Sequence, residues 1–138
     1  MLVLLRSEAS RHSIVTRTEL SDELPLVQVD RVQLQQVLMN LMLNGIEAME
    51  MTRGEMTIRS QRDGDHVLVS VSDTGVGLFG HNLDRIFESF YTTKSRGTGM
   101  GLSISRSIIE AHGGRLWAAN NDARGATFYF TLPAEKKI

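Results

Sequence analysis

A long segment without clear apolar periodicity divides this chain, and it constrains the fold more than any other feature of the sequence. The segment covers residues 78–96, and only residues 83–87 within it are typical of a short turn of helix. Glycine-bearing motifs lie at both of its ends, at residues 73–77 and 97–102. Loops of this length in a compact domain are usually functional or disordered. The sequence therefore predicts a domain with a functional loop inserted between its two halves.

The composition of the 138-residue chain is typical of one globular domain. Hydrophobic residues make up 41% of the chain, enough for a core, and the net charge of -1 gives no sign of a nucleic-acid partner. The absence of cysteine excludes disulfides and thiolate metal sites. The apolar start at residues 2–5 is too short for a signal peptide or a membrane span. It fits better as the end of an amphipathic helix from something larger, so we expect residues 1–12 to end a preceding helix or linker and residues 13–138 to form one domain, without direct membrane contact.

Hydrophobic periodicity predicts helices and strands on both sides of the long segment. Asp30 is the expected N-cap of the first complete helix, with Gln33 closing a capping box. The order of elements predicts an α+β fold, a two-layer α/β sandwich in which helices cover one face of a mostly antiparallel mixed sheet. The expected elements are an edge strand at 14–20, a helix from 30 to about 49, strands at 56–59 and 67–71 joined by a turn at 62–65, a helix at 98–112 ended by Gly113 and Gly114, and strands at 115–119 and 126–132.

Asp73, Gly75 and Gly77 form the first candidate binding motif. Asp73 follows a predicted strand, and a carboxylate there can accept a hydrogen bond from the 6-amino group of adenine, whereas the carbonyl of guanine would be repelled. The two glycines allow the backbone to turn sharply and to approach a ring closely. The alternative is an ordinary Asp-x-Gly turn between strands.

Gly97, Gly99 and Gly101 precede and open the second long helix. Backbone N–H groups at a helix start can bind phosphates, because these groups and the helix dipole both favour anions. The spacing matches neither a Walker loop nor the dinucleotide motif, and a flexible hinge is the alternative. Lys94, just before the glycines, could reach a terminal phosphate, although most lone lysines in loops are only solvated.

Asn40 and Asn44 lie one helical turn apart, so their side chains project from the same face of the predicted helix. Asparagine is a poor residue for the middle of a helix, so such a pair indicates a specific role. Two amide oxygens suit Mg²⁺, which takes few protein ligands and keeps water and phosphate as the others. The alternative is a pair of hydrogen-bonded polar residues in the core. The four histidines lack metal-ligand spacing, and we expect them to be structural or on the surface.

Together these motifs resemble those of the catalytic, ATP-binding domain of bacterial sensor histidine kinases, which belong to a wider superfamily with DNA gyrase and Hsp90 and share the Bergerat ATP-binding fold. The resemblance covers residues 14–133. Gly45 departs from the usual alanine and weakens its helix locally. The segments that carry the resemblance are residues 40–48 (N box), 73–77 (G1 box), 86–94 (F box) and 97–102 (G2 box).

The resemblance implies a role for each candidate residue. Asn44 is expected to be the main Mg²⁺ ligand with Asn40 assisting, and Asp73 is expected to read adenine. Thr127 matches a hydroxyl that supports the adenine site. Residues 78–96 would form the ATP lid, held down by Phe87 and Phe90. The residues expected to bind the phosphates or the rest of the nucleotide are Lys94, Gly75, Gly77, Gly97, Gly99, Gly101 and Leu102.

The resemblance further implies transfer of the γ-phosphoryl group of ATP to a histidine. The related ATPases carry a glutamate base four residues before the Mg²⁺-binding asparagine, and here that position is Asn40, which favours phosphoryl transfer over hydrolysis. No histidine in the chain is followed by Glu or Asp and then a proline four residues on, which is the pattern of the phosphoacceptor box. The resemblance therefore implies an acceptor histidine on a separate dimerisation domain, whose helix pair would end at residues 2–12. A response regulator receiver domain is the expected downstream partner. The expected location is cytoplasmic. The alternatives are a conformational ATPase and a non-catalytic nucleotide-binding module.

Overall fold

The computed structural model describes residues 14–49, 54–78, 83, 85–88 and 101–135. Each strand and helix found there matches a predicted element: four of the five strands extend the predicted bounds by one to four residues, and the helices end within one residue of the predicted ends. The expected helix at 2–12 and the expected helix start at 98–100 lie outside the described residues. The elements are β1 (Ile14–Leu20), α2 (Arg31–Ala48), β2 (Gly54–Asp63), β3 (His66–Ser72), the 3-10 helix η1 (Arg85–Phe87), α3 (Gly101–Ala111), β4 (Arg115–Asn120) and β5 (Ala126–Pro133).

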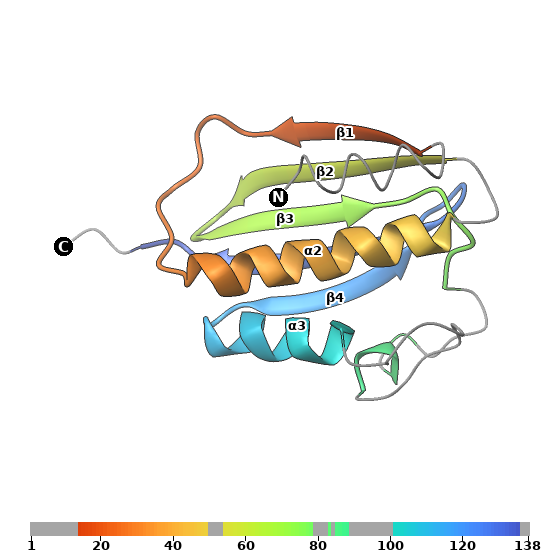
Figure 1. Cartoon of the computed structure of the whole chain (residues 1–138). Helices are drawn as coiled ribbons and strands as arrows, with labels where there is room; N and C mark the ends of the chain where they lie inside the picture. Colours follow the sequence, from red (N-terminus) through yellow and green to blue (C-terminus); the bar gives the residue numbers. More distant parts are fainter. Residues whose placement is uncertain (1–13, 50–53, 79–82, 84, 89–100, 136–138) are drawn as a thin grey trace.

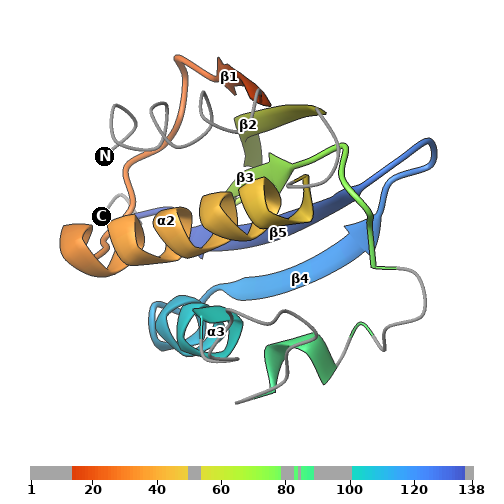
Figure 2. The ribbon, with the colours of Figure 1, turned by 45° about the vertical axis from the view of Figure 1, so that its right-hand side comes forward.

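The strands form one sheet in the order β1-β2-β3-β5-β4. β1 is the predicted edge strand and pairs with β2 in parallel, whereas the other three pairs are antiparallel. Both α2 and α3 lie on one face of this sheet (Figures 1 and 2). These features confirm the predicted α+β sandwich with a mostly antiparallel mixed sheet. No helix in the described part of the chain is both long and apolar enough to span a bilayer.

The core lies between the sheet and the two helices. Alternate residues of β5 point into it, because side chains along a strand face opposite sides of a sheet in turn. The opposite face of the sheet is here called the open face, because neither α2 nor α3 covers it (Figure 2). It carries the intervening residues of β5, which are Thr127, Tyr129 and Thr131. The buried hydrophobic residues of α2, β3, β5 and α3 include Val37, Leu41, Met42, Ile46, Val67, Val71, Phe128, Phe130, Leu132, Ile108 and Ile109.

A hydrogen bond between the start of α2 and the end of α3 replaces the predicted capping box. Asp30 is the N-cap of α2 as predicted, and its Oδ1 accepts the N–H of Gln33 at 3.0 Å. The capping-box prediction is wrong, because the N–H of Asp30 donates to Nε2 of His112 at 3.1 Å. Nδ1 of the same ring lies 2.8 Å from the carbonyl oxygen of Ile108. His112 is therefore structural, as expected, and it ties the end of α3 to the start of α2.

The C-terminus of α3 is closed by the predicted glycine pair. The N–H of Gly113 donates to the carbonyl of Glu110 at 3.0 Å, and the N–H of Gly114 donates to that of Ile109 at 2.9 Å. This pattern is a Schellman motif, and it requires the left-handed backbone that Gly113 adopts, with φ of 81°. The chain then enters β4 directly against β5, so that a Cβ on Gly114 would lie 1.9 Å from the carbonyl oxygen of Thr131.

We expect Gly114→Ala to lower the free energy of unfolding by about 3 kcal/mol, because the backbone of β5 would have to move. The control is Gly64→Ala in the β2–β3 turn, where φ is 59° and nothing lies within 4 Å of the added Cβ. That control should lose only about 1 kcal/mol, through the left-handed backbone. Urea denaturation of both variants measures the difference, and equal losses would contradict this account of the α3–β4 connection.

Candidate functional site

Asp73 directly follows β3, and its side chain is buried, with 3% exposed. Its Oδ1 accepts hydrogen bonds from the N–H of Gly75 at 2.9 Å and of Ala126 at 3.3 Å. The backbone N–H of Asp73 donates to the carbonyl oxygen of Ala126 at 2.9 Å. Hydrogen bonds from N–H groups to a carboxylate are among the stronger ones in proteins. The carboxylate is therefore an oriented acceptor at the point where β3 ends and β5 begins.

The last turns of α2 pass beside this carboxylate. A Cβ on Gly45 would lie 3.6 Å from Cβ of Asp73 and 3.3 Å from Sδ of Met56. A Cβ on Gly75 would lie 2.3 Å from the carbonyl oxygen of Ala48, so a side chain at Gly75 is excluded. From the sequence, Gly45 is expected only to weaken the helix locally. The structure shows that Gly45 also faces Asp73. The lack of side chains at these two glycines allows α2 and the loop after Asp73 to lie in contact.

The loop of residues 73–78, here called the Asp73 loop, continues from this carboxylate. Val76 donates its N–H to the carbonyl oxygen of Ala48 at 3.1 Å, which attaches the middle of the loop to α2. Gly77 has a φ of 75°, so this predicted glycine supplies a left-handed backbone. The loop therefore lies against the end of α2 through Gly75 and Val76, and Gly77 follows them.

Asn40 connects α2 to the first turn of α3. Its Nδ2 donates to the carbonyl oxygen of Gly101 at 3.3 Å and to Oγ of Ser105 at 3.2 Å. Because Nδ2 points toward α3, the amide oxygen is directed elsewhere and keeps its capacity to bind a cation. Asn44 is half-buried on the same helix. Asn40 therefore lies between α2 and the start of α3, and Asn44 follows it one turn later on α2.

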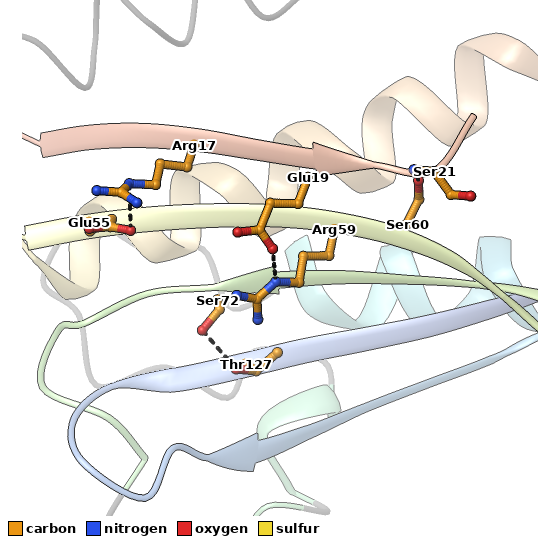
Figure 3. A network of polar contacts seen from close by, with 8 residues as sticks. All are labelled: Arg17, Glu19, Ser21, Glu55, Arg59, Ser60, Ser72 and Thr127. Carbon is orange, nitrogen blue, oxygen red and sulfur yellow. Dashed lines mark hydrogen bonds and ion pairs between the residues drawn. The ribbon is translucent and has the colours of Figure 1, made fainter. Parts of the chain in front are cut away.

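The hydroxyl of Thr127 bonds other residues than Asp73. This hydroxyl lies 2.9 Å from Oγ of Ser72 and 2.5 Å from Oδ1 of Asn121. Thr127 and Ser72 lie on the open face (Figure 3). They face this side because each is next to a core residue of its own strand, and side chains along a strand alternate between the two faces. The structure places this hydroxyl on Ser72 and Asn121 and not on Asp73, and its support of the adenine site stays a prediction. The neighbouring residue Ala126 bonds Asp73 through backbone groups alone: its N–H donates to the carboxylate, and its carbonyl oxygen accepts the N–H of Asp73.

The open face also carries exposed ion pairs (Figure 3). Arg17 and Glu55 form one pair, with Nε and Oε1 2.9 Å apart, and Arg59 and Glu19 form another. The hydrogen bond and positive charge of Arg59 hold the pKa of Glu19 below its usual range. Exposed pairs of this kind contribute little to stability, so we assign them no functional role.

The middle of the expected lid is attached to the core. Ile86 and Phe87 are buried, and the ring of Phe87 meets that of Phe128 edge to face, with centroids 6.2 Å apart. The guanidinium of Arg106 lies 4.9 Å from the centroid of the Phe87 ring. The predicted packing of Phe87 is thus confirmed. Leu102 also packs against the core. The predicted residues that lie outside the described part of the chain are Phe90, Lys94, Gly97 and Gly99.

Two residues that the sequence analysis missed hold the Asp73 loop from the β4–β5 turn. The N–H of Leu78 donates to Oδ1 of Asn120 at 2.6 Å. Nδ2 of Asn121 donates to the carbonyl oxygen of Asp73 at 2.9 Å and to that of Arg124 at 3.1 Å. Asparagine is common in turns, so this pair at the end of a predicted strand gave no signal of contact with Asp73.

The chain is similar to known proteins over most of its length. Residues 29–136 match the family described as histidine kinase-, DNA gyrase B-, and HSP90-like ATPases. The sensor protein FixL of Bradyrhizobium diazoefficiens is 49% identical to the chain over 128 residues, which are 91% of this chain and 25% of FixL. The chain therefore spans only a quarter of the length of this curated relative.

Solved structures of a histidine kinase are also similar to the chain. The catalytic domain of the histidine kinase ThkA has a TM-score of 0.84 and 38% identity, over 96% of this chain and 86% of that domain. ThkA in complex with the response regulator protein TrrA has a TM-score of 0.81 and 35% identity, over 96% of this chain and 38% of the matched chain. The described fold is therefore that of a known histidine kinase catalytic domain.

We expect Gly125→Ala to displace Asp73, because the added Cβ would lie 2.0 Å from its carbonyl oxygen and 2.8 Å from Oδ1. The control is Gly113→Ala, since Gly113 has a similar φ of 81° against 86° but its nearest neighbour is a Pro133 side-chain atom at 3.3 Å. Amide NMR spectra should show large shifts for Asp73 and Gly75 only in the Gly125 variant. Shifts of equal size in both variants would contradict the close packing described here.

Proposed function

Since the chain belongs to the family of histidine kinase-, DNA gyrase B- and HSP90-like ATPases, we propose that it is the ATP-binding catalytic domain of a sensor histidine kinase. In this proposal it transfers the γ-phosphoryl group of ATP to a histidine on a separate dimerisation domain. The observation that carries the proposal is the buried, oriented carboxylate of Asp73 beside glycines that let the backbone approach a ligand. The likeness to the catalytic domain of ThkA supports the same conclusion.

Asp73 is the proposed adenine reader. Its carboxylate can accept the 6-amino hydrogen of adenine, while the 6-carbonyl of guanine would meet it with a second acceptor. Discrimination of this kind is strong in a buried site, because a polar group left without a partner is costly there. The enclosed position of Asp73 between α2 and the start of β5 supports this role.

Mg²⁺ is the proposed cofactor, with Asn44 as its main protein ligand and Asn40 assisting. Among the described residues no group of three or more His, Cys, Asp or Glu is placed to hold a metal. Amide oxygens on one face of α2 fit a cation that takes most of its ligands from phosphate and water. When bound, Mg²⁺ would neutralise charge on the phosphates. The orientation of the Asn40 amide, with its nitrogen on Gly101, is compatible with this use of its oxygen.

Phosphoryl transfer is favoured over hydrolysis by the side chain at position 40. An amide cannot take a proton from water, and Nδ2 of Asn40 is engaged with α3. In the proposed reaction an imidazole nitrogen of the acceptor histidine bonds to the γ-phosphorus, the bond to the β–γ bridging oxygen breaks, and ADP leaves. By the resemblance to sensor kinases, Lys94 and the glycines at 97, 99 and 101 would bind the phosphates.

The proposed partners are the histidine-bearing dimerisation domain of the same kinase and a response regulator receiver domain. FixL is about four times as long as the matched segment, which leaves room in such a protein for an acceptor domain. ThkA has been solved with the response regulator TrrA, which supports a receiver domain as the downstream partner. We propose a cytoplasmic location for the domain, where ATP is available.

We expect the chain to bind ADP with Mg²⁺ and to prefer it over GDP, and Asp73→Asn to weaken ADP binding by about 10- to 100-fold. The asparagine keeps the shape but presents an amide in place of an acceptor. Asp65→Asn, in the exposed β2–β3 turn, changes the charge equally and should leave the affinity unchanged. Titration calorimetry measures both variants. Unchanged affinity for ADP in Asp73→Asn would refute the adenine assignment.

We expect the chain not to phosphorylate itself on histidine, but to phosphorylate a supplied dimerisation domain slowly, because separate domains lack enforced proximity. Asn44→Ala should slow this transfer by about 100-fold or more through loss of a Mg²⁺ ligand. Gln35→Ala, at an exposed position of the same helix, is the control. The assay follows labelled γ-phosphate. Acid-labile label on the chain alone, or an undiminished rate with Asn44→Ala, would overturn this mechanism.

A further inference from the structure

We propose that Asn120 and Asn121 are positioning residues that hold both ends of the Asp73 loop in the conformation that reads adenine. Both residues bond backbone groups of the loop, so they would act on the ligand through Asp73. The inference rests on the proposed role of Asp73 in adenine binding. It assigns to the β4–β5 turn a part in nucleotide affinity and specificity.

Asn121 holds the first residue of the loop. Its Nδ2 donates to the carbonyl oxygens of Asp73 at 2.9 Å and Arg124 at 3.1 Å, and it also lies 3.2 Å from Oγ of Ser72. The carbonyl oxygens of Asp73 and Arg124 can only accept, so the nitrogen of the amide must face them. Fixing this carbonyl fixes the peptide plane after Asp73, and with it the direction in which the carboxylate leaves the backbone.

Thr127 keeps the Asn121 amide in this orientation. Oδ1 of Asn121 lies 2.5 Å from the Thr127 hydroxyl and has no hydrogen of its own, so the hydroxyl must donate. The hydroxyl of Thr127 in turn lies 2.9 Å from that of Ser72, which can donate to it. Thr127 thus contributes to the site indirectly, through the orientation of Asn121, and from the open face of the sheet.

Asn120 holds the other end of the loop. Its Oδ1 accepts the N–H of Leu78 at 2.6 Å, so here the oxygen of the amide is the group in use. Asn120 is the last residue of β4 and pairs with Ala126, whose N–H binds the Asp73 carboxylate. The two asparagines therefore join the loop to the strand end that orients the carboxylate, and the bond from Val76 to Ala48 holds the loop from the α2 side.

Asn121 holds the loop through its amide nitrogen, and Asn120 holds it through its amide oxygen. Replacing each asparagine with aspartate should therefore have different effects, because aspartate keeps the acceptor and loses the donor. Asn121→Asp replaces a donor with a second acceptor against the carbonyl of Asp73, and we expect ADP affinity to fall about tenfold or more. Asn120→Ala leaves the N–H of Leu78 without its acceptor and should also weaken ADP binding. Asn120→Asp restores an acceptor and should recover most of that loss. Ala123→Asp, exposed in the same turn, controls for the added charge.

The experiment measures ADP and GDP affinity by calorimetry, and amide exchange of Leu78 by NMR, on the full chain with Mg²⁺. Asn121→Asp should reduce the ratio of ADP to GDP affinity, which a general loss of stability would not do selectively. Asn120→Ala should speed exchange of the Leu78 amide, and Asn120→Asp should not. If Asn121→Asp does not fold, Thr127→Val decides, because it removes the donor to Oδ1 at similar volume and should also lower the ratio.

The outcomes separate this inference from the proposed function. If the unmodified chain binds ADP with adenine preference, but Asn121→Asp or its substitute Thr127→Val retains the full ratio, the positioning role is refuted and the proposed function stands. If Asn120→Asp is as weak as Asn120→Ala, the acceptor role of Asn120 is refuted. If the unmodified chain does not bind ADP, the proposed function itself fails.

Discussion

The antiparallel pairing of β3 with β5 sets the position of both the core and the candidate site. Its register places Val71 beside Phe128 on the helix side and Ser72 beside Thr127 on the open face. One residue further, Asp73 returns to the helix side and bonds Ala126 through both backbone and carboxylate. A slip of one residue would turn every side chain to the other face and carry the carboxylate with them. The hydrophobic pattern that builds the core therefore also orients the polar group that is proposed to read the ligand.

Features that depend on neighbours in the chain could be predicted from the sequence. The alternation of Phe128, Phe130 and Leu132 with polar residues is visible within one strand, and so is the β2–β3 turn at Gly64. Asp73 could be proposed as a ligand-binding residue because a strand precedes it and glycines follow it. Local patterns of this kind report which face of an element is buried, and that was enough to predict the order of elements and the layer arrangement.

Contacts between residues far apart in the chain could not be predicted in the same way. The N–H of Asp30 bonds His112, 82 residues away, and no local pattern distinguishes that partner from the nearby Gln33. Asn121 and Asp73 are 48 residues apart, and their contact depends on where β4 ends and the turn begins. The side chain of Thr127 is a different case. Its neighbour Phe128 is a core residue, so strand alternation already indicated that Thr127 faces the open side.

The burial of Phe87 has a consequence for the reach of Lys94. The core holds Phe87 on one side, and α3 holds Gly101 on the other, so Lys94 is tethered seven residues from each anchor. A fully extended chain spans at most about 3.5 Å per residue, so the Cα of Lys94 stays within about 25 Å of either anchor, whatever the path between them. Two tethers of equal length confine a residue to the overlap of two spheres. The proposed role of Lys94 therefore requires that the phosphates be bound within reach of both Phe87 and Gly101.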